Sequence, residues 1–166
     1  MIDLIWKVWP PHDVLRIMKR VTLALLIAAA AALPAASAEG AAHAARGAKL
    51  EIKNTSLGRI LANGRGLTVY MFTHDQVNQD TCVAISGCTG IWPLVTSSGT
   101  PTLGPGVKRS LVGAIKLPGG QRQVTYAGHP LYTYIADAGP GDTSYVGQSQ
   151  FGGRWYALSP AGHSVK

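Results

Sequence analysis

Two short motifs combine aromatic rings with a carboxylate, and each could line a groove for a small ligand. One has the sequence YMFTHD at residues 70–75, and the other has YTYIAD at residues 132–137. Residues two apart in a strand share a face, so each motif presents two rings together and a carboxylate beyond the strand end. The alternative is structural, because such rings also pack cores and aspartates accept backbone N–H groups in turns. The candidate ligand-binding residues are Tyr70, Phe72, Asp75, Tyr132, Tyr134 and Asp137.

A second aspartate follows each motif, and the two loops together hold Asp75, Asp80, Asp137 and Asp142. Carboxylate oxygens bind hard cations such as Ca²⁺, which makes these four residues weak candidates for metal ligands. Two carboxylates per loop are few for that ion, and neither loop has EF-hand spacing. Turn and helix-cap roles are therefore the favoured interpretation, and no cofactor is predicted.

Cys82 and Cys88 are the only cysteines of the chain. Two cysteines so close in an exported protein predict an intramolecular disulfide, worth about 2–3 kcal/mol in the chain-entropy view. The alternative is a redox-active pair, which usually has Cys-x-x-Cys spacing.

Motifs for catalysis are missing from the sequence. It contains no nucleophile elbow, phosphate loop, zinc-protease helix or haem-attachment motif. His74, His129 and His163 show no metal-ligand spacing. No catalytic residue is assigned, and a non-catalytic protein is favoured over an enzyme.

The two motifs belong to a longer internal repeat. At an offset of 62 residues the first motif aligns with the second, and Asp80-Thr81-Cys82 aligns with Asp142-Thr143-Ser144. Trp92 aligns with Trp155 at an offset of 63. Residues that recur in register usually occupy equivalent sites. The repeats are expected at about 49–105 and 106–166, sharing one core.

The elements around the motifs are expected to be short strands. Apolar residues recur at spacing two from Lys49 onward, and breakers rich in Gly and Pro separate these runs. Residues 116–121 and 127–129 are predicted as tight turns between strands. The predicted fold class is mostly β, with short antiparallel strands and hairpins and two related repeats in one sandwich- or barrel-like core.

The first 38 residues predict export. Residues 18–38 have a basic start, a 13-residue apolar run and a small-x-small site, so we expect a signal peptide cleaved after Ala38. Residues 1–17 fit a start assigned too far upstream or a long n-region, and the first is favoured. Residues 39–48 are expected to be a flexible linker. The apolar run is shorter than the roughly 20 residues of a membrane span.

Charge narrows the expected partners. The chain has a formal net charge of +7, of which the first 38 residues supply +2, so the mature part has a net charge of +5. Its Lys and Arg residues are scattered and form no stripe, which argues against nucleic acid. An anionic envelope component or a small ligand is the expected partner, with no membrane span in the mature protein.

The doubled motif, with Cys82, Cys88 and Trp92-Pro93 in the first unit, resembles a bacterial secreted-repeat family of unknown function. Its members are known as predicted lipoproteins with a conserved Yx(F/W/Y)xxD motif. The resemblance spans roughly residues 49–163 and implies no established activity. This chain departs from it by lacking a lipobox cysteine and by having Ser144 where the first unit has Cys82.

The sequence therefore predicts a periplasmic or secreted, non-catalytic module for binding or envelope interaction. One alternative is a small periplasmic enzyme or redox protein that uses the motif aspartates or the cysteine pair. Another is a purely structural secreted protein.

Overall fold

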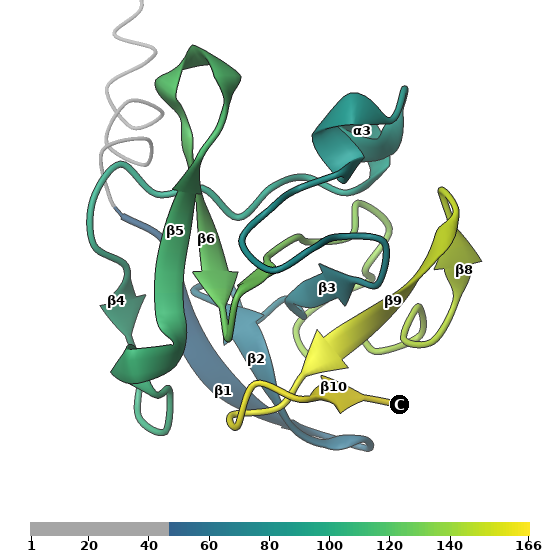
Figure 1. Ribbon diagram of the computed structural model, residues 1–166. Helices are drawn as coiled ribbons and strands as arrows, with labels where there is room; N and C mark the ends of the chain where they lie inside the picture. Colours follow the sequence, from purple (N-terminus) through teal and green to yellow (C-terminus); the bar gives the residue numbers. More distant parts are fainter. Residues whose placement is uncertain (1–46) are drawn as a thin grey trace, which may run out of the picture. The chain divides into compact units, whose positions relative to one another are not determined.

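The computed structural model describes residues 47–166 (Figure 1). The predicted signal peptide, its cleavage after Ala38 and the start at Met18 lie outside the described residues. Ala48 is the last residue of the expected linker, and its N–H donates to Ser97 Oγ at 3.0 Å. Its carbonyl accepts the N–H of Thr102 at 2.8 Å, so the folded part already includes Ala48.

Strands dominate the described residues, which confirms the mostly β prediction. The strands are β1 (Lys49–Thr55), β2 (Gly58–Asn63), β3 (Tyr70–Phe72), β4 (Thr102–Leu103), β5 (Val112–Lys116), β6 (Arg122–Tyr126), β7 (His129–Pro130), β8 (Ser149–Gln150), β9 (Gly153–Leu158) and β10 (Ser164–Val165). The helical segments are short: η1 (Cys82–Ala84), α3 (Cys88–Ile91), η2 (Arg109–Leu111) and η3 (Pro118–Gly120). Within residues 47–166 no helix is long and apolar enough to span a membrane.

The strands form three small sheets (Figure 1). Their orders are β2-β1-β4, β5-β6-β7 and β10-β9-β3, and β8 pairs with β9 in addition. Apart from the parallel pair β1–β4, all these pairings are antiparallel. No sheet in the described part of the chain closes into a barrel.

Each repeat opens with a hairpin whose turn suits its residues. β1 and β2 meet at Gly58, which has φ +89°, a conformation that side chains with a Cβ rarely adopt. β5 and β6 are joined across η3, where Gly119 has φ +84°. The second hairpin confirms the predicted turn at residues 116–121. Ala127 and Gly128 likewise form the predicted turn between β6 and β7, with φ of +51° and +80°.

The two repeats meet backbone to backbone at the first tyrosine of each motif. The Tyr70 N–H donates to the Tyr132 carbonyl at 2.9 Å, and the Tyr132 N–H donates to the Tyr70 carbonyl at 3.0 Å. Tyr70 also pairs with Ala157 of the second repeat, as Tyr132 pairs with Leu94 of the first. This reciprocity gives the described fold a local twofold relation between its repeats.

The core has two parts, and both draw on both repeats. The aliphatic part holds residues of the two hairpins and the segments after them: Leu50, Leu61, Val69, Met71, Val95, Val124, Tyr126, Leu131 and Leu158. The aromatic part holds the motif rings, both indoles and the cysteines: Tyr70, Phe72, Cys82, Cys88, Trp92, Tyr132 and Trp155. Neither repeat can therefore complete either part alone.

Candidate functional site

The motif tyrosines and aspartates bond across the repeats. The Tyr70 hydroxyl donates to Asp137 Oδ1 at 3.0 Å. The Tyr132 hydroxyl donates to Asp75 Oδ2 at 2.7 Å. Each phenol thus meets the carboxylate of the other repeat, although each motif carries its own aspartate only three to five residues from its rings. These two hydrogen bonds link the repeats, and hydrogen bonds to an ionised acceptor are stronger than those between neutral groups.

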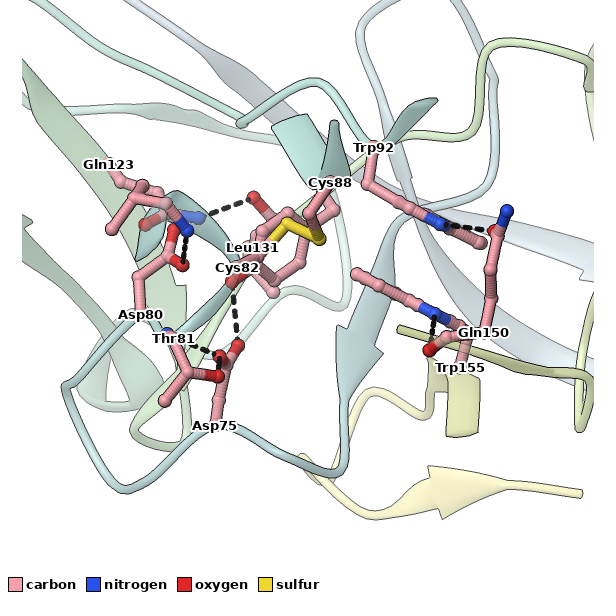
Figure 2. The surroundings of a disulfide bond; sticks show 12 residues. Asp75, Asp80, Thr81, Cys82, Cys88, Trp92, Gln123, Leu131, Gln150 and Trp155 are labelled. Carbon is pink, nitrogen blue, oxygen red and sulfur yellow. Dashed lines mark hydrogen bonds between the residues drawn. A yellow bond between two sulfur atoms is a disulfide. The ribbon is translucent and has the colours of Figure 1, made fainter. Parts of the chain in front are cut away.

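The two carboxylates have unequal surroundings. Asp75 Oδ1 accepts both the N–H and the hydroxyl of Thr81, each at 2.8 Å, so both its oxygens are engaged (Figure 2). Asp137 Oδ2 is buried without a hydrogen-bond partner among residues 47–166. The second repeat therefore retains a carboxylate oxygen with an open acceptor position.

Burial shifts the pKa values of all four groups upward. It raises the pKa of Asp137 to about 6, against the stabilising hydrogen bond from Tyr70. Burial also raises the pKa of Asp75, although the bonds from Thr81 and Tyr132 favour its charged form. The pKa values of both tyrosines rise because of burial and, next, the neighbouring negative aspartate. The tyrosines therefore stay protonated and act as donors.

The rings of the motifs stack on the two repeated tryptophans. Trp92 and Trp155 lie face to face, with ring centroids 3.7 Å apart and planes 1° from parallel. Phe72 extends the stack on the outer face of Trp155 at 4.1 Å, and Tyr134 extends it on Trp92 at 4.7 Å. One motif ring from each repeat therefore caps one end of a four-ring stack.

Gln150 holds both indoles of this stack. The Trp92 Nε1–H donates to its side-chain Oε1 at 2.9 Å, and the Trp155 Nε1–H donates to its carbonyl at 3.3 Å. Figure 2 shows the two indoles side by side with Gln150 at their nitrogen edge. Gln150 gave no signal in the sequence because its side chain bonds Trp92, which lies 58 positions away along the chain.

Half of the predicted ligand-binding residues are fully buried. Tyr70 and Tyr132 are 0% exposed and Phe72 is 1% exposed, whereas Tyr134 and both aspartates are partly buried. The structure brings all six residues together, but around a packed ring stack. The hollow next to Arg109 and the one next to Arg154 are both lined by other residues.

Asp80 and Asp142, the second aspartate of each repeat, accept backbone N–H groups in a turn and at a helix start. Asp80 Oδ1 accepts the N–H of Val83 at 3.0 Å, at the start of η1. Asp142 accepts the N–H groups of Ala138 and Ser144, each at 2.8 Å, and these bonds lower its pKa. Within residues 47–166, no group of three His, Cys, Asp or Glu residues is placed to hold a metal ion.

The predicted disulfide is confirmed. Cys82 and Cys88 are bonded, with Cα atoms 5.4 Å apart, and both are fully buried beside the ring stack (Figure 2). The bond joins η1 to α3, the segment that leads directly into Trp92. It therefore fixes the chain that carries one of the two central indoles.

A basic hollow lies on the second hairpin, away from the motifs. Arg109 of η2 and Arg122 of β6 line it, and it has a volume of about 340 Å³. Its remaining lining comes from the β5 backbone and from a nearby loop: Val112, Gly113, Ala114, Gly99, Thr100 and Pro101. No carboxylate lines it, and both arginines are exposed. Sequence reasoning missed this pair because 12 other residues separate the two arginines.

These features define a β protein of two repeats whose halves exchange Tyr–Asp hydrogen bonds around a shared aromatic core. The chain belongs to the family described as a secreted repeat of unknown function, whose model matches residues 51–96 and again residues 113–159. The two matches confirm the internal repeat and agree with the expectation of export. No curated protein and no solved structure matches the chain in these comparisons.

Proposed function

We propose that this protein is an exported, non-catalytic binding module that recognises an anionic group in the hollow between Arg109 and Arg122. The observation that carries the proposal is the lining itself, which includes two exposed arginines and no Asp or Glu. Guanidinium groups present planar sets of donors that match phosphate and carboxylate oxygens. An anionic component of the cell envelope, in the periplasm or outside the cell, is the expected ligand.

The distribution of charge supports an anionic partner. Residues 47–166 contain ten Lys and Arg but five Asp and Glu. The one ion pair in this part of the chain joins Lys49 and Glu51 at 2.8 Å. The four aspartates lie in the motif loops, where their carboxylates accept hydrogen bonds from backbone N–H groups and phenols. The other basic side chains therefore give the surface a positive potential that favours anionic ligands.

The shape of the hollow supports a ligand with a small apolar part. Gly113 and Ala114 have little or no side chain, so the β5 backbone forms a low floor beside Arg122. A Cβ at Gly113 would lie 2.7 Å from Oγ1 of Thr125, which is buried, so a larger residue at this position would displace Thr125. Pro101 and Val112 add apolar walls next to the charged groups. An anionic headgroup on a short apolar body fits this combination.

Binding to anionic and neutral vesicles tests this function. We expect the mature protein to sediment with phosphatidylglycerol vesicles and not with phosphatidylcholine vesicles. Inorganic phosphate and citrate should shift NMR signals of residues 109–114 and 122 if a free anion suffices. The double variant Arg109→Gln/Arg122→Gln should lose this binding, while Arg65→Gln/Arg154→Gln, with the same net charge, should retain it.

Equal loss in both double variants would overturn the proposal, because binding would then depend on overall charge and not on the hollow. Retention of binding in Arg109→Gln/Arg122→Gln would contradict it as well. Absence of binding to every anionic probe would favour the purely structural alternative.

A further inference from the structure

A continuous series of ring contacts leads from a buried tyrosine to the surface. Tyr132 meets Trp155 edge-on, with ring centroids 5.1 Å apart. Trp155 stacks on Trp92 at 3.7 Å, and Trp92 stacks on Tyr134 at 4.7 Å. Tyr134 lies 4.2 Å from Tyr145, and both of these last rings are partly exposed. By the twofold relation, Tyr70 joins the same series through Trp92 at 5.2 Å.

The buried end of this series carries both a redox-active ring and a base. A phenol that loses one electron becomes a strong acid, so its oxidation is easiest where a base can take the proton at once. The hydroxyls of Tyr132 and Tyr70 donate to carboxylate oxygens at 2.7 and 3.0 Å. Because burial raises the pKa of Asp137 to about 6, this carboxylate is a better proton acceptor than an exposed one.

We propose that the ring series and its two Tyr–Asp pairs form a one-electron relay that brings an oxidising equivalent from the surface to Tyr132 or Tyr70. The external oxidant is an outer-sphere one-electron acceptor, such as an oxidised metal complex or a small radical. It gains one electron from Tyr145, Tyr134 or a tryptophan, and that ring regains an electron from the next ring inward. A surface tyrosine releases its phenolic proton to water when it is oxidised and takes one back from water when it is reduced again. At the buried end, the phenol and carboxylate become a neutral phenoxyl radical and a carboxylic acid.

Oxidation of the buried phenol moves its proton only along the existing Tyr–Asp hydrogen bond. One electron leaves the protein, the phenolic proton moves to Asp75 or Asp137, and no bond to carbon breaks. One electron from a reductant, with return of the proton from the carboxyl group, restores the resting state. Tyr132 and Tyr70 are fully buried. A radical on either ring is therefore shielded from coupling with a tyrosyl radical of a second protein molecule.

Tyr126 supplies a matched control inside the same fold. Its ring is also 0% exposed, but its hydroxyl donates to the Pro160 carbonyl at 2.8 Å, which is no base. It packs in the aliphatic part of the core, outside the ring series. The relay therefore predicts no stable radical on Tyr126.

Flash-quench oxidation of the mature protein by ruthenium(III) tris-bipyridine tests the relay. We expect a long-lived tyrosyl radical, detected by transient absorption and by electron paramagnetic resonance of frozen samples. Tyr70→Phe/Tyr132→Phe keeps every ring and should lose the long-lived signal, while Tyr126→Phe should keep it. Asp75→Asn/Asp137→Asn keeps side-chain size but removes the base, and it should also lose the signal.

A measurement on the unaltered protein keeps the test decisive if a variant fails to fold. Radical formation in the wild type should slow in D₂O, because the proton moves with the electron. A signal of unchanged lifetime in the folded Tyr70→Phe/Tyr132→Phe variant would place the radical on exposed tyrosines and overturn the relay. Unchanged formation rates in D₂O would overturn it too. Neither result bears on anion binding at Arg109 and Arg122.

Discussion

At the scale of single residues, the motif aspartates show how burial decides chemistry. Asp75 accepts an N–H and two hydroxyls, and Asp142 accepts two N–H groups, whereas Asp137 has one phenol as its donor and one oxygen without a partner among residues 47–166. The same residue type at the equivalent positions 75 and 137 thus has different hydrogen-bond donors, although burial raises the pKa of both carboxyl groups. The repeat pattern predicted equivalent positions, but the local donors that set the pKa depend on loop conformation.

Asp137 should make stability fall as the pH rises. Its pKa is 3.8 in the unfolded reference and about 6 in the folded protein, so the folded state binds the proton more tightly. Its favourable contribution is complete below pH 3.8 and is lost as the pH rises through about 6. Asp137→Asn should therefore gain stability relative to wild type between pH 4 and pH 8. Urea denaturation at both pH values measures this.

Asp142→Asn serves as the control with the opposite sign. Hydrogen bonds from Ala138 and Ser144 lower the pKa of Asp142, so its contribution is present above 3.8 and is lost as the pH falls. This variant should lose stability relative to wild type at pH 8 more than at low pH. The same direction of change in both variants would contradict the assignment of these two environments.

Tyr132 should contribute strongly to stability through its burial. Tyr132→Ala removes a ring that is 0% exposed and should cost about 3–5 kcal/mol, the range for truncating large aromatic core residues. Ile135→Ala, at a side chain that is 56% exposed, should cost under about 0.5 kcal/mol. Denaturant midpoints give both values, and a small loss for Tyr132→Ala would show that the ring does not belong to the core.

At the scale of elements, turns and the disulfide position the strands and the ring stack. The β5–β6 hairpin turns at Gly119, where φ is +84°, and the disulfide holds η1 against α3 before Trp92. Both features follow from local sequence: a Pro-Gly-Gly turn and two cysteines six positions apart. They could be predicted because neither depends on distant parts of the chain.

Gly119→Ala should weaken the second hairpin. A Cβ at this position meets nothing within 4 Å, so the cost comes from the left-handed backbone alone. That cost is about 1–2 kcal/mol for a residue with a Cβ. Gly139→Ala also has open space but no positive φ, and it should change stability little or raise it slightly. Thermal denaturation of the two variants separates backbone conformation from space.

Removal of the disulfide should lower stability by about 2 kcal/mol, since the bond closes a short loop. Cys82→Ser/Cys88→Ser is the variant, and guanidinium denaturation is the measurement. Tryptophan fluorescence should change as well, because the loop leads into Trp92. An unaltered spectrum and midpoint would show that packing alone fixes this segment.

At the scale of the whole molecule, the two repeats should unfold together. Trp92 and Trp155 come from different repeats and stack at 3.7 Å, and the Tyr–Asp bonds also cross between repeats. A substitution in either repeat, Tyr70→Ala or Tyr132→Ala, should therefore shift amide-exchange protection in both β1–β2 and β5–β6 by similar amounts. Protection lost in only one hairpin would show two separate folding units.

The mostly β class, the internal repeat, two tight turns and the disulfide could all be predicted from the amino-acid sequence. Each of these depends on spacing, turn residues or identities in register along the chain. The expected groove of motif residues depended on how Tyr70, Phe72 and Tyr132 face the rest of the fold. A strand pattern shows that two rings share a face, but it does not show whether another layer covers that face.

The partners of the motif residues depend on how the two repeats pack together. Tyr70 bonds the aspartate of the other repeat, 67 positions away, and Gln150 bonds Trp92 across 58 positions. The tertiary structure also placed Arg109 and Arg122 in the lining of one hollow, because η2 and β6 both border it. Side-chain contacts over such distances depend on how hairpins pair and stack, and local propensity and spacing carry no information about that packing.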